Sequence, residues 1–394
     1  MPRFEPFRAL RYSPSLPLGD VSAPPYDVLS EQDRERLGLH HEVNIVHVDM
    51  PIGDEHGRYE AAANLLSNWI EHGVMVRDDQ ASFTLYRMEF TDALGNRRRT
   101  VGVMGALEVR DEGAGEVLPH ERTTPKAKTD RLQLTRATRA NLSPVWGLSL
   151  ADGLTNALAE SGEEVGRFTD ESGVTHIVER VTNPQRLDTI SRLIAAQPVV
   201  IADGHHRYAI SRTYRDECRA LGKLPGSELT LTFVNELISE QLSVQAIHRL
   251  YRAVSFAELK DHLAIFFDMT DGGSVSEQVL NEIQQKNALA LVDPRGQVTL
   301  MTPKSSLFTG VRDLDSARLE HALTGLAHDV AYQHGYHEVM HELNNERAEA
   351  AVFIKPVSVA EIQRTAHEGL LMPPKSTFFT PKLRTGLVIR EIDA

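Results

Sequence analysis

The chain has 394 residues, of which 41% are hydrophobic and 25% are charged, so its composition is that of an ordinary globular protein with length for two or three domains. Its formal net charge of −13 argues against a nucleic-acid partner, because neutralising phosphates needs clustered Lys and Arg. The sequence contains neither the ~20 consecutive apolar residues of a membrane-spanning helix nor a signal peptide, so we expect a cytoplasmic protein without a membrane partner.

Hydrophobic periodicity predicts the elements of the N-terminal part. Its first residues are proline-rich, which prevents a regular helix before about residue 28, and Ser30 is the expected N-cap of a short helix. The acidic stretch 153–173 is expected to form a helix and a surface loop. Further helices are predicted at 59–71, 187–196 and 206–221, and strands at 82–90, 99–107, 145–150, 199–202 and 229–237.

The C-terminal part shows the same mixture of patterns. Helices are predicted at 256–267, 276–285, 329–343 and 359–367, and strands at 292–300 and 350–354. Ser255 and Glu258 have capping-box spacing at the start of the first of these helices. Because strands and helices mix without strict βαβ alternation, we predict an α+β fold of mixed layers. We expect a catalytic body over residues 1–255 and a smaller α/β part over 256–394, whose tail returns to the site.

A buried strand at 199–202 leads directly into Asp203, Gly204, His205, His206 and Arg207, and then into a helix. A helix N-terminus presents backbone N–H groups and partial positive charge, so this turn suits an anion. Gly204 permits close approach of a phosphate, Arg207 offers a bidentate fork, and the histidines can donate to phosphate oxygens. Asp203 is a candidate Mg²⁺ ligand, or a simple helix cap.

Residues 118–131 form a second group of functional side chains. His120, Glu121, Arg122, Lys128 and Arg131 lie within one irregular segment. Imidazole, carboxylate and cations together are what phosphoryl transfer needs for positioning and charge neutralisation. A solvated loop before a helix has a similar composition, so composition alone leaves both readings open.

Two proline-bearing segments form a third group. Pro24 and Pro25 place Tyr26 and Asp27 on a stiff turn, and residues 372–382 present cations and hydroxyls on another. A rigid backbone suits substrate positioning, although prolines near the termini often have a purely structural role and only set the direction of the chain.

His337, Glu338 and His341 match the H-E-x-x-H pattern of zinc peptidases, with Glu361 as a candidate third ligand. The intervening 350–356 segment is predicted as a strand, whereas zincins carry the third ligand on a helix. A chance match is expected in a chain with many histidines and glutamates, so we disfavour a zinc site.

The chain resembles, over nearly its full length, the bacterial and archaeal family of unknown function numbered 1015. The shared motifs are Ala23–Asp27, His120–Thr123 with Lys128, Asp130 and Arg131, Ala140–Pro144, Ala202–Tyr208 and Met372–Thr377. One departure is Ala246 and Ile247 before His248 and Arg249, where the family pattern has Pro-Thr.

The Asp203–Arg207 turn also resembles, over a shorter stretch, the nucleotide-phosphate turn of ParB and sulfiredoxin-like proteins, a superfamily that includes free-serine kinases. This resemblance implies nucleotide phosphate binding at Gly204, His205, His206 and Arg207, and transfer to a small hydroxylated metabolite. A DNA-binding role borrowed from ParB is disfavoured by the acidic charge.

The leading hypothesis is therefore an ATP- or ADP-dependent, Mg²⁺-dependent kinase of a small hydroxylated acid, with free serine as the best single guess. The alternatives are a non-catalytic nucleotide-responsive regulator and a metal-assisted phosphatase. Glu121 or Asp27 is the candidate base, and His120 and Asp203 complete the catalytic set. The oligomeric state is left open. Residues predicted to bind substrate are Tyr26, Arg122, Thr123, Lys128, Arg131, His248, Arg249, Lys375, Ser376 and Lys382.

Overall fold

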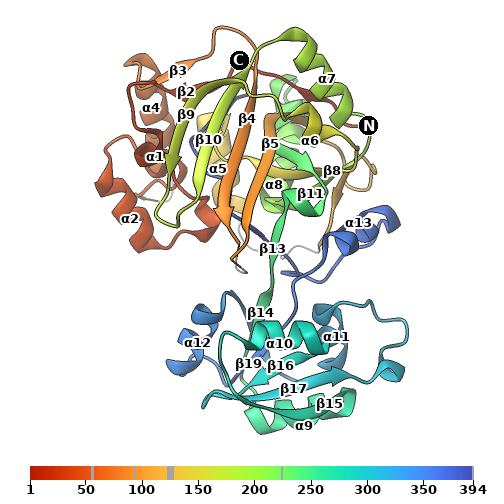
Figure 1. Cartoon of the computed structure of the whole chain (residues 1–394). Coiled ribbons are helices and arrows are strands. Elements are labelled where there is room, and N and C mark those ends of the chain that lie inside the picture. Colours follow the sequence, from red (N-terminus) through yellow and green to blue (C-terminus); the bar gives the residue numbers. More distant parts are fainter. Residues whose placement is uncertain (55–56, 93–94, 122–127, 223–224, 393–394) are drawn as a thin grey trace. The chain divides into compact units, whose positions relative to one another are not determined.

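The computed structural model describes residues 1–54, 57–92, 95–121, 128–222 and 225–392, without the side chains of residues 128–129. The chain divides into two compact units (Figure 1). The first comprises Met1–Ser243 together with Pro381–Ala394, and the second is Val244–Thr380. The expected boundary at residue 255 therefore falls inside the second unit, and the last segment of the chain belongs to the first.

Among the described residues, the first unit is built on a nine-stranded mixed sheet with the order β6-β11-β8-β12-β5-β4-β10-β9, with β1 paired to β5. The pairs β6–β11 and β8–β12 are parallel, and the other pairs are antiparallel. The predicted fold of mixed α and β layers is thus confirmed. The strands are β1 (Phe4–Glu5), β4 (Phe83–Thr91), β5 (Arg97–Glu108), β6 (Val117–Pro119), β8 (Val145–Ser149), β9 (Glu163–Thr169), β10 (Thr175–Val181), β11 (Val199–Asp203) and β12 (Leu229–Glu236).

Helices and short strand pairs complete the first unit. One core cluster joins the sheet to α6, α7 and α8, and another joins α3, α4 and α5 to β2 and β3. The helices are α1 (Leu18–Val21), η1 (Tyr26–Val28), α2 (Glu31–His40), α3 (Val46–Asp49), α4 (Gly57–Glu71), α5 (Lys128–Thr138), α6 (Leu154–Ala157), α7 (Pro184–Ile194), α8 (His205–Ala220), η2 (Pro225–Glu228) and η3 (Ser239–Gln241), and the paired short strands are β2 (Leu10–Tyr12) with β3 (Met75–Arg77) and β7 (Ala140–Asn141) with β21 (Arg390–Glu391).

The second unit contains an antiparallel sheet with the order β15-β17-β16-β19-β14-β18. Its strands are β14 (Ile247–Arg252), β15 (Phe267–Ser274), β16 (Leu289–Val292), β17 (Gln297–Pro303), β18 (Asp329–His334) and β19 (Ala350–Phe353), with the separate pair β13 (Ser243–Gln245) and β20 (Phe378–Thr380). Its helices are α9 (Phe256–Phe266), α10 (Val279–Lys286), η4 (Ser305–Phe308), α11 (Asp315–Ala322), α12 (Tyr336–Asn344) and α13 (Val359–Glu368).

Two helix starts expected from cap residues are confirmed. The Ser30 hydroxyl accepts a hydrogen bond from Asp33 N at 3.1 Å, and the Asp33 carboxylate accepts one from Ser30 N at 3.1 Å. The Ser255 hydroxyl likewise accepts from Glu258 N at 3.2 Å. These bonds satisfy amide groups that lack a partner within the helix.

Three predictions are wrong because strand pairing outweighs the local sequence pattern. Residues 329–334, expected in a helix, form β18 against β14, and Gly335 with φ 79° separates this strand from α12. The stretch expected as a surface loop contains β9, which pairs with β10. The single strand expected at 292–300 is two strands joined by a turn, in which the Asp293 carboxylate accepts from Gln297 N at 2.7 Å.

Within the described ranges, no helix combines the length and the apolar character that a membrane crossing requires.

Gly105 of β5 provides a test of the packing against the sheet. A Cβ at this position would lie 2.4 Å from Phe4 and 2.7 Å from Phe83. Gly105→Ala should therefore destabilise the first unit by about 1–3 kcal/mol through overpacking. Both tryptophans of the chain, Trp69 and Trp146, lie in this unit, so urea unfolding followed by tryptophan fluorescence reports on it. Thr91→Ala, at an exposed position of β4, is the control and should leave the midpoint unchanged.

Candidate active site

The parallel pairing of β6 with β11 brings two of the predicted groups together. Val117 pairs with Val199 and Leu118 with Val200, so His120 follows the end of β6 where Asp203 ends β11. The His120 ring is fully buried, with Nδ1 2.5 Å from the carbonyl oxygen of Ile201. Parallel neighbours end at one edge of a sheet, which is why the two sequence groups meet.

Gly204 gives the turn into α8 its shape. It is the N-cap residue, with φ 81° and ψ 29°, a left-handed conformation that glycine adopts without steric cost. A Cβ here would lie 3.0 Å from Nε of Arg207, so the absence of a side chain also makes room for the guanidinium group. The first turn then presents His205, whose ring lies 4.9 Å from that of His120. The predicted electropositive helix start is therefore next to two imidazoles.

Arg207 lies at the centre of the site and is 9% exposed. Its Nη2 is 3.0 Å from the Asp203 carboxylate and 3.5 Å from that of Asp27, and its Nη1 donates to the carbonyl oxygen of Pro144. Its Nε has no hydrogen-bond partner in the described part of the chain. Burial alone would lower the pKa of Arg207, but Asp27 and Asp203 outweigh it and raise the pKa above its usual value.

Asp203 binds a second cation that comes from the end of the chain. Nζ of Lys382 lies 3.4 Å from Oδ1 of Asp203, whose Oδ2 faces Arg207. Burial raises the pKa of Asp203, but the positive charges of Lys382, Arg207 and His205 outweigh burial. The net effect lowers the pKa below its usual value, so the carboxylate stays ionised. The side chain does not form the helix-capping bond that was its alternative role, since Gly204 is the N-cap and no side-chain cap bond is present there.

Tyr26, Arg131 and Asp49 continue the site on its other side. The Arg131 guanidinium lies 4.4 Å from the centre of the Tyr26 ring, and its Nη1 is 2.5 Å from the Asp49 carbonyl oxygen and 3.3 Å from Oδ1. Burial raises the pKa of Tyr26 to about 12 and also raises the pKa of Asp49. These residues and Arg207 line a cavity of about 50 Å³, enough for a water molecule.

Asp49 was missed by the sequence analysis. It is 4% exposed and ends α3, in which Val46 and Val48 are also buried, and a carboxylate that follows two buried valines is a signal that could have found it. Ser143, whose hydroxyl is 3.5 Å from the same carboxylate, lies within a motif that was recognised without a role.

The remaining predicted residues of the 118–131 segment are described only in part. Oε2 of Glu121 lies 3.8 Å from Nε2 of His120. Arg122 and Thr123 lie outside the described residues, and Lys128 begins α5 with its side chain outside them. Their roles stay predictions.

Four predicted substrate-binding residues lie in the second unit. His248 is 2% exposed and accepts a hydrogen bond from Ile354 N at 3.2 Å, and burial lowers its pKa to about 3. Arg249 stacks on the Tyr332 ring at 4.7 Å. The remaining two are Lys375, with φ 56°, and the buried Ser376. Their role in binding substrate stays a prediction.

The H-E-x-x-H motif lies on α12. Nε2 of His337 is 2.8 Å from the Glu277 carboxylate, and His341 contacts Asn345. Glu361 is bound by Arg312 at 2.8 Å. Across the described ranges, no three His, Cys, Asp or Glu side chains form a group suited to a metal ion.

A family model described as a protein of unknown function, DUF1015, matches residues 4–317. The chain belongs to this family. The match includes the Asp203–Arg207 turn, the 118–131 segment and the Tyr26–Asp27 turn. No curated protein matches the sequence.

Three solved structures are similar to the chain at low identity. A conserved hypothetical protein from Pyrococcus furiosus has a TM-score of 0.37 at 11% identity, covering 67% of this chain and 87% of its own. A free serine kinase in complex with AMP has a TM-score of 0.37 at 12% identity, covering 67% and 84%. SbnI with a C-terminal truncation, from Staphylococcus aureus, has a TM-score of 0.38 at 11% identity, covering 71% and 84%. At these scores the likeness by itself carries no functional inference.

The Lys382–Asp203 pair predicts a defined dependence of stability on pH. Lys382→Met leaves the partly buried Asp203 with one cation fewer, which should destabilise the first unit by about 1–3 kcal/mol at neutral pH. The pKa of Asp203 is lowered on folding, so the ion pair stabilises the unmodified protein fully above the unfolded pKa of Asp203. This stabilisation disappears as the pH falls through the folded pKa. The deficit in urea unfolding should therefore be constant from roughly pH 5 to 8 and shrink below about pH 4.

Lys382→Arg is the matched control for this measurement, since it keeps the charge. A deficit in Lys382→Met that does not change at acid pH, or one that Lys382→Arg reproduces in full, contradicts the role given to the ion pair.

Proposed function

We propose that the Asp203–Arg207 turn binds the phosphates of ATP or ADP and that the protein is a nucleotide-dependent kinase of a small hydroxylated acid, with free serine as the first candidate. The observation that carries this proposal is the start of α8, where an uncapped glycine turn, Arg207 and Lys382 surround Asp203 beside His120. A helix N-terminus with cations suits phosphate binding, and phosphoryl transfer depends mainly on such positioning and charge neutralisation.

The residues at this position also suit Mg²⁺. Asp27 and Asp203 converge on one guanidinium group, and carboxylate oxygens are ligands that Mg²⁺ prefers. An Mg²⁺ ion held by one or two carboxylates would take its other ligands from phosphate oxygens and water, which is its usual manner of binding to nucleotide enzymes. When bound, the ion would neutralise charge on the phosphates.

In this reaction one carboxylate would act as the base, and the cations would hold the phosphates. Asp27 or Glu121 would accept the proton of the substrate hydroxyl, whose oxygen then bonds to the terminal phosphorus as the bond to the nucleotide oxygen breaks. The Asp27 side chain is 38% exposed and Glu121 15%, so both can reach a ligand. Lys382, Arg207 and the start of α8 would hold the negative charge of the phosphates, and His120 would steady the transferred group.

Turnover tests the proposal directly. The purified chain is incubated with Mg²⁺, L-serine or another hydroxy acid, and ATP or ADP, and the products are identified by phosphorus NMR. The expected result is a phosphorylated acid with an equal amount of the nucleotide lacking one phosphate. Nucleotide binding without turnover would instead favour the regulator, and phosphate release from phosphoserine without nucleotide would favour the phosphatase.

Gly204→Ala tests whether the turn is the nucleotide site. The change strains a left-handed residue and pushes against Arg207, so nucleotide affinity should fall by roughly tenfold or more. Gly222→Ala is the matched control, because Gly222 follows the other end of α8 with φ 63° and has open space around it. Equal nucleotide affinity in both variants, measured by isothermal titration, would reject the site.

A further inference from the structure

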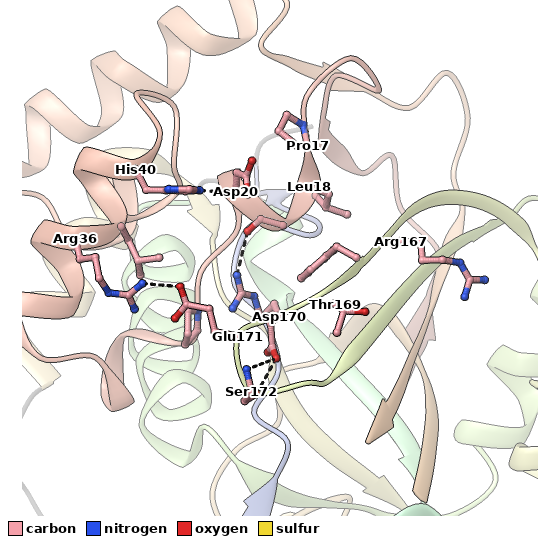
Figure 2. A pocket seen from close by; sticks show the side chains of 15 residues that line it. Pro17, Leu18, Asp20, Arg36, His40, Arg167, Thr169, Asp170, Glu171 and Ser172 are labelled. Carbon is pink, nitrogen blue, oxygen red and sulfur yellow. Dashed lines mark hydrogen bonds and ion pairs between the residues drawn. The ribbon is translucent and has the colours of Figure 1, made fainter. Parts of the chain in front are cut away.

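A second cavity, of about 400 Å³, lies in the first unit away from Asp203 and Arg207, neither of which lines it. It is formed by α1, by α2 and by the end of β9 with the turn that follows, and Arg384 of the C-terminal segment contributes to its wall. Figure 2 shows Leu18, Arg36 and Thr169 around this space. A cavity of this volume is in the range of small-molecule sites.

Arg384 is a buried cation that has no carboxylate partner among the described residues. It is 8% exposed, and its Nη2 donates to the carbonyl oxygens of Ser22 at 2.8 Å and Gly19 at 3.3 Å. Nε has no hydrogen-bond partner within the described ranges, and the guanidinium forms no ion pair with an Asp or Glu there. Burial lowers the pKa of Arg384, so the protein bears the cost of an incompletely paired charge.

The acidic side chains around the cavity are already engaged with other groups, as Figure 2 shows for two of them. They do not pair with Arg384, yet their negative charge opposes an anion with several charges. The cavity therefore favours an anion with a single charge. The pairs are Asp170 with His176 at 3.0 Å, Glu171 with Arg36 at 2.9 Å and Asp20 with His40 at 3.3 Å.

Part of the remaining wall is apolar. The Phe168 ring lies 5.5 Å from Cζ of Arg384, and Leu18, Leu37 and Pro24 also line the space. Sites for small molecules combine such a lining with a few polar groups that fix orientation. An arginine fork matches the geometry of a carboxylate.

We propose that this cavity binds a small organic monocarboxylate, with its carboxylate on Arg384 and its apolar body against Phe168 and Leu18. The site is separate from the nucleotide turn and does not depend on the function proposed for it.

Isothermal titration of the full chain tests the site with hexanoate and 3-phenylpropanoate, their neutral amides and inorganic phosphate. At least one carboxylate should bind with one-to-one stoichiometry. Its amide should bind roughly tenfold to hundredfold more weakly, because the charge-assisted hydrogen bond is lost. Phosphate should bind more weakly than the carboxylate. Absence of carboxylate binding, or equal affinity for the amide or for phosphate, overturns the proposal.

Two variants locate the site. Thr169→Trp fills the cavity from an exposed position and should abolish carboxylate binding. Thr175→Trp, at the residue paired with Thr169 across the strands but outside the lining, should leave binding unchanged. Arg384→Gln should remove the preference for carboxylate over amide even where overall affinity changes little. Unaltered binding in Thr169→Trp, or an unaltered preference in Arg384→Gln, contradicts the assignment.

Discussion

The candidate active site depends on the buried guanidinium group of Arg207. A charge removed from water is tolerated when carboxylates and carbonyl oxygens surround it, and here Asp203, Asp27 and the carbonyl oxygen of Pro144 do so. These three partners come from the end of β11, from η1 and from the segment before β8. One cation thereby holds together three parts of the chain that are far apart in sequence, and Gly204 is the residue that leaves room for it.

The C-terminal segment connects the site with the second cavity. Lys382 reaches Asp203, and Arg384, two residues later, lines the cavity. Thr385, the next residue, joins this segment to the N-terminal segment, because Ala23 and Thr385 exchange backbone hydrogen bonds of 3.1 and 2.8 Å. A ligand on Arg384 would therefore contact the same paired segments that position Asp27 and Lys382. Such a shared support is a physical route by which occupancy of one site can shift the other.

Prediction from sequence was accurate where local chemistry determines the structure. Ser30 and Ser255 cap helices because their hydroxyls bond to amides three residues away. The strand before Asp203 and the helix after Gly204 follow from an apolar run and a glycine. Residues 329–334 were assigned wrongly, because pairing with β14 outweighs their local pattern.

The sequence by itself determined the mixed α and β character, the strand–glycine–helix turn and the side chains that it carries, since each follows from neighbours within a few residues. Only the tertiary structure decided which distant groups meet there. The parallel pairing of β6 and β11 brings His120 to Asp203, and the returning tail supplies Lys382. Asp49 and the buried Arg384, which donates to oxygens of Gly19 and Ser22, belong to the same class, because burial and ion pairing depend on the whole fold and leave no periodic pattern in the chain.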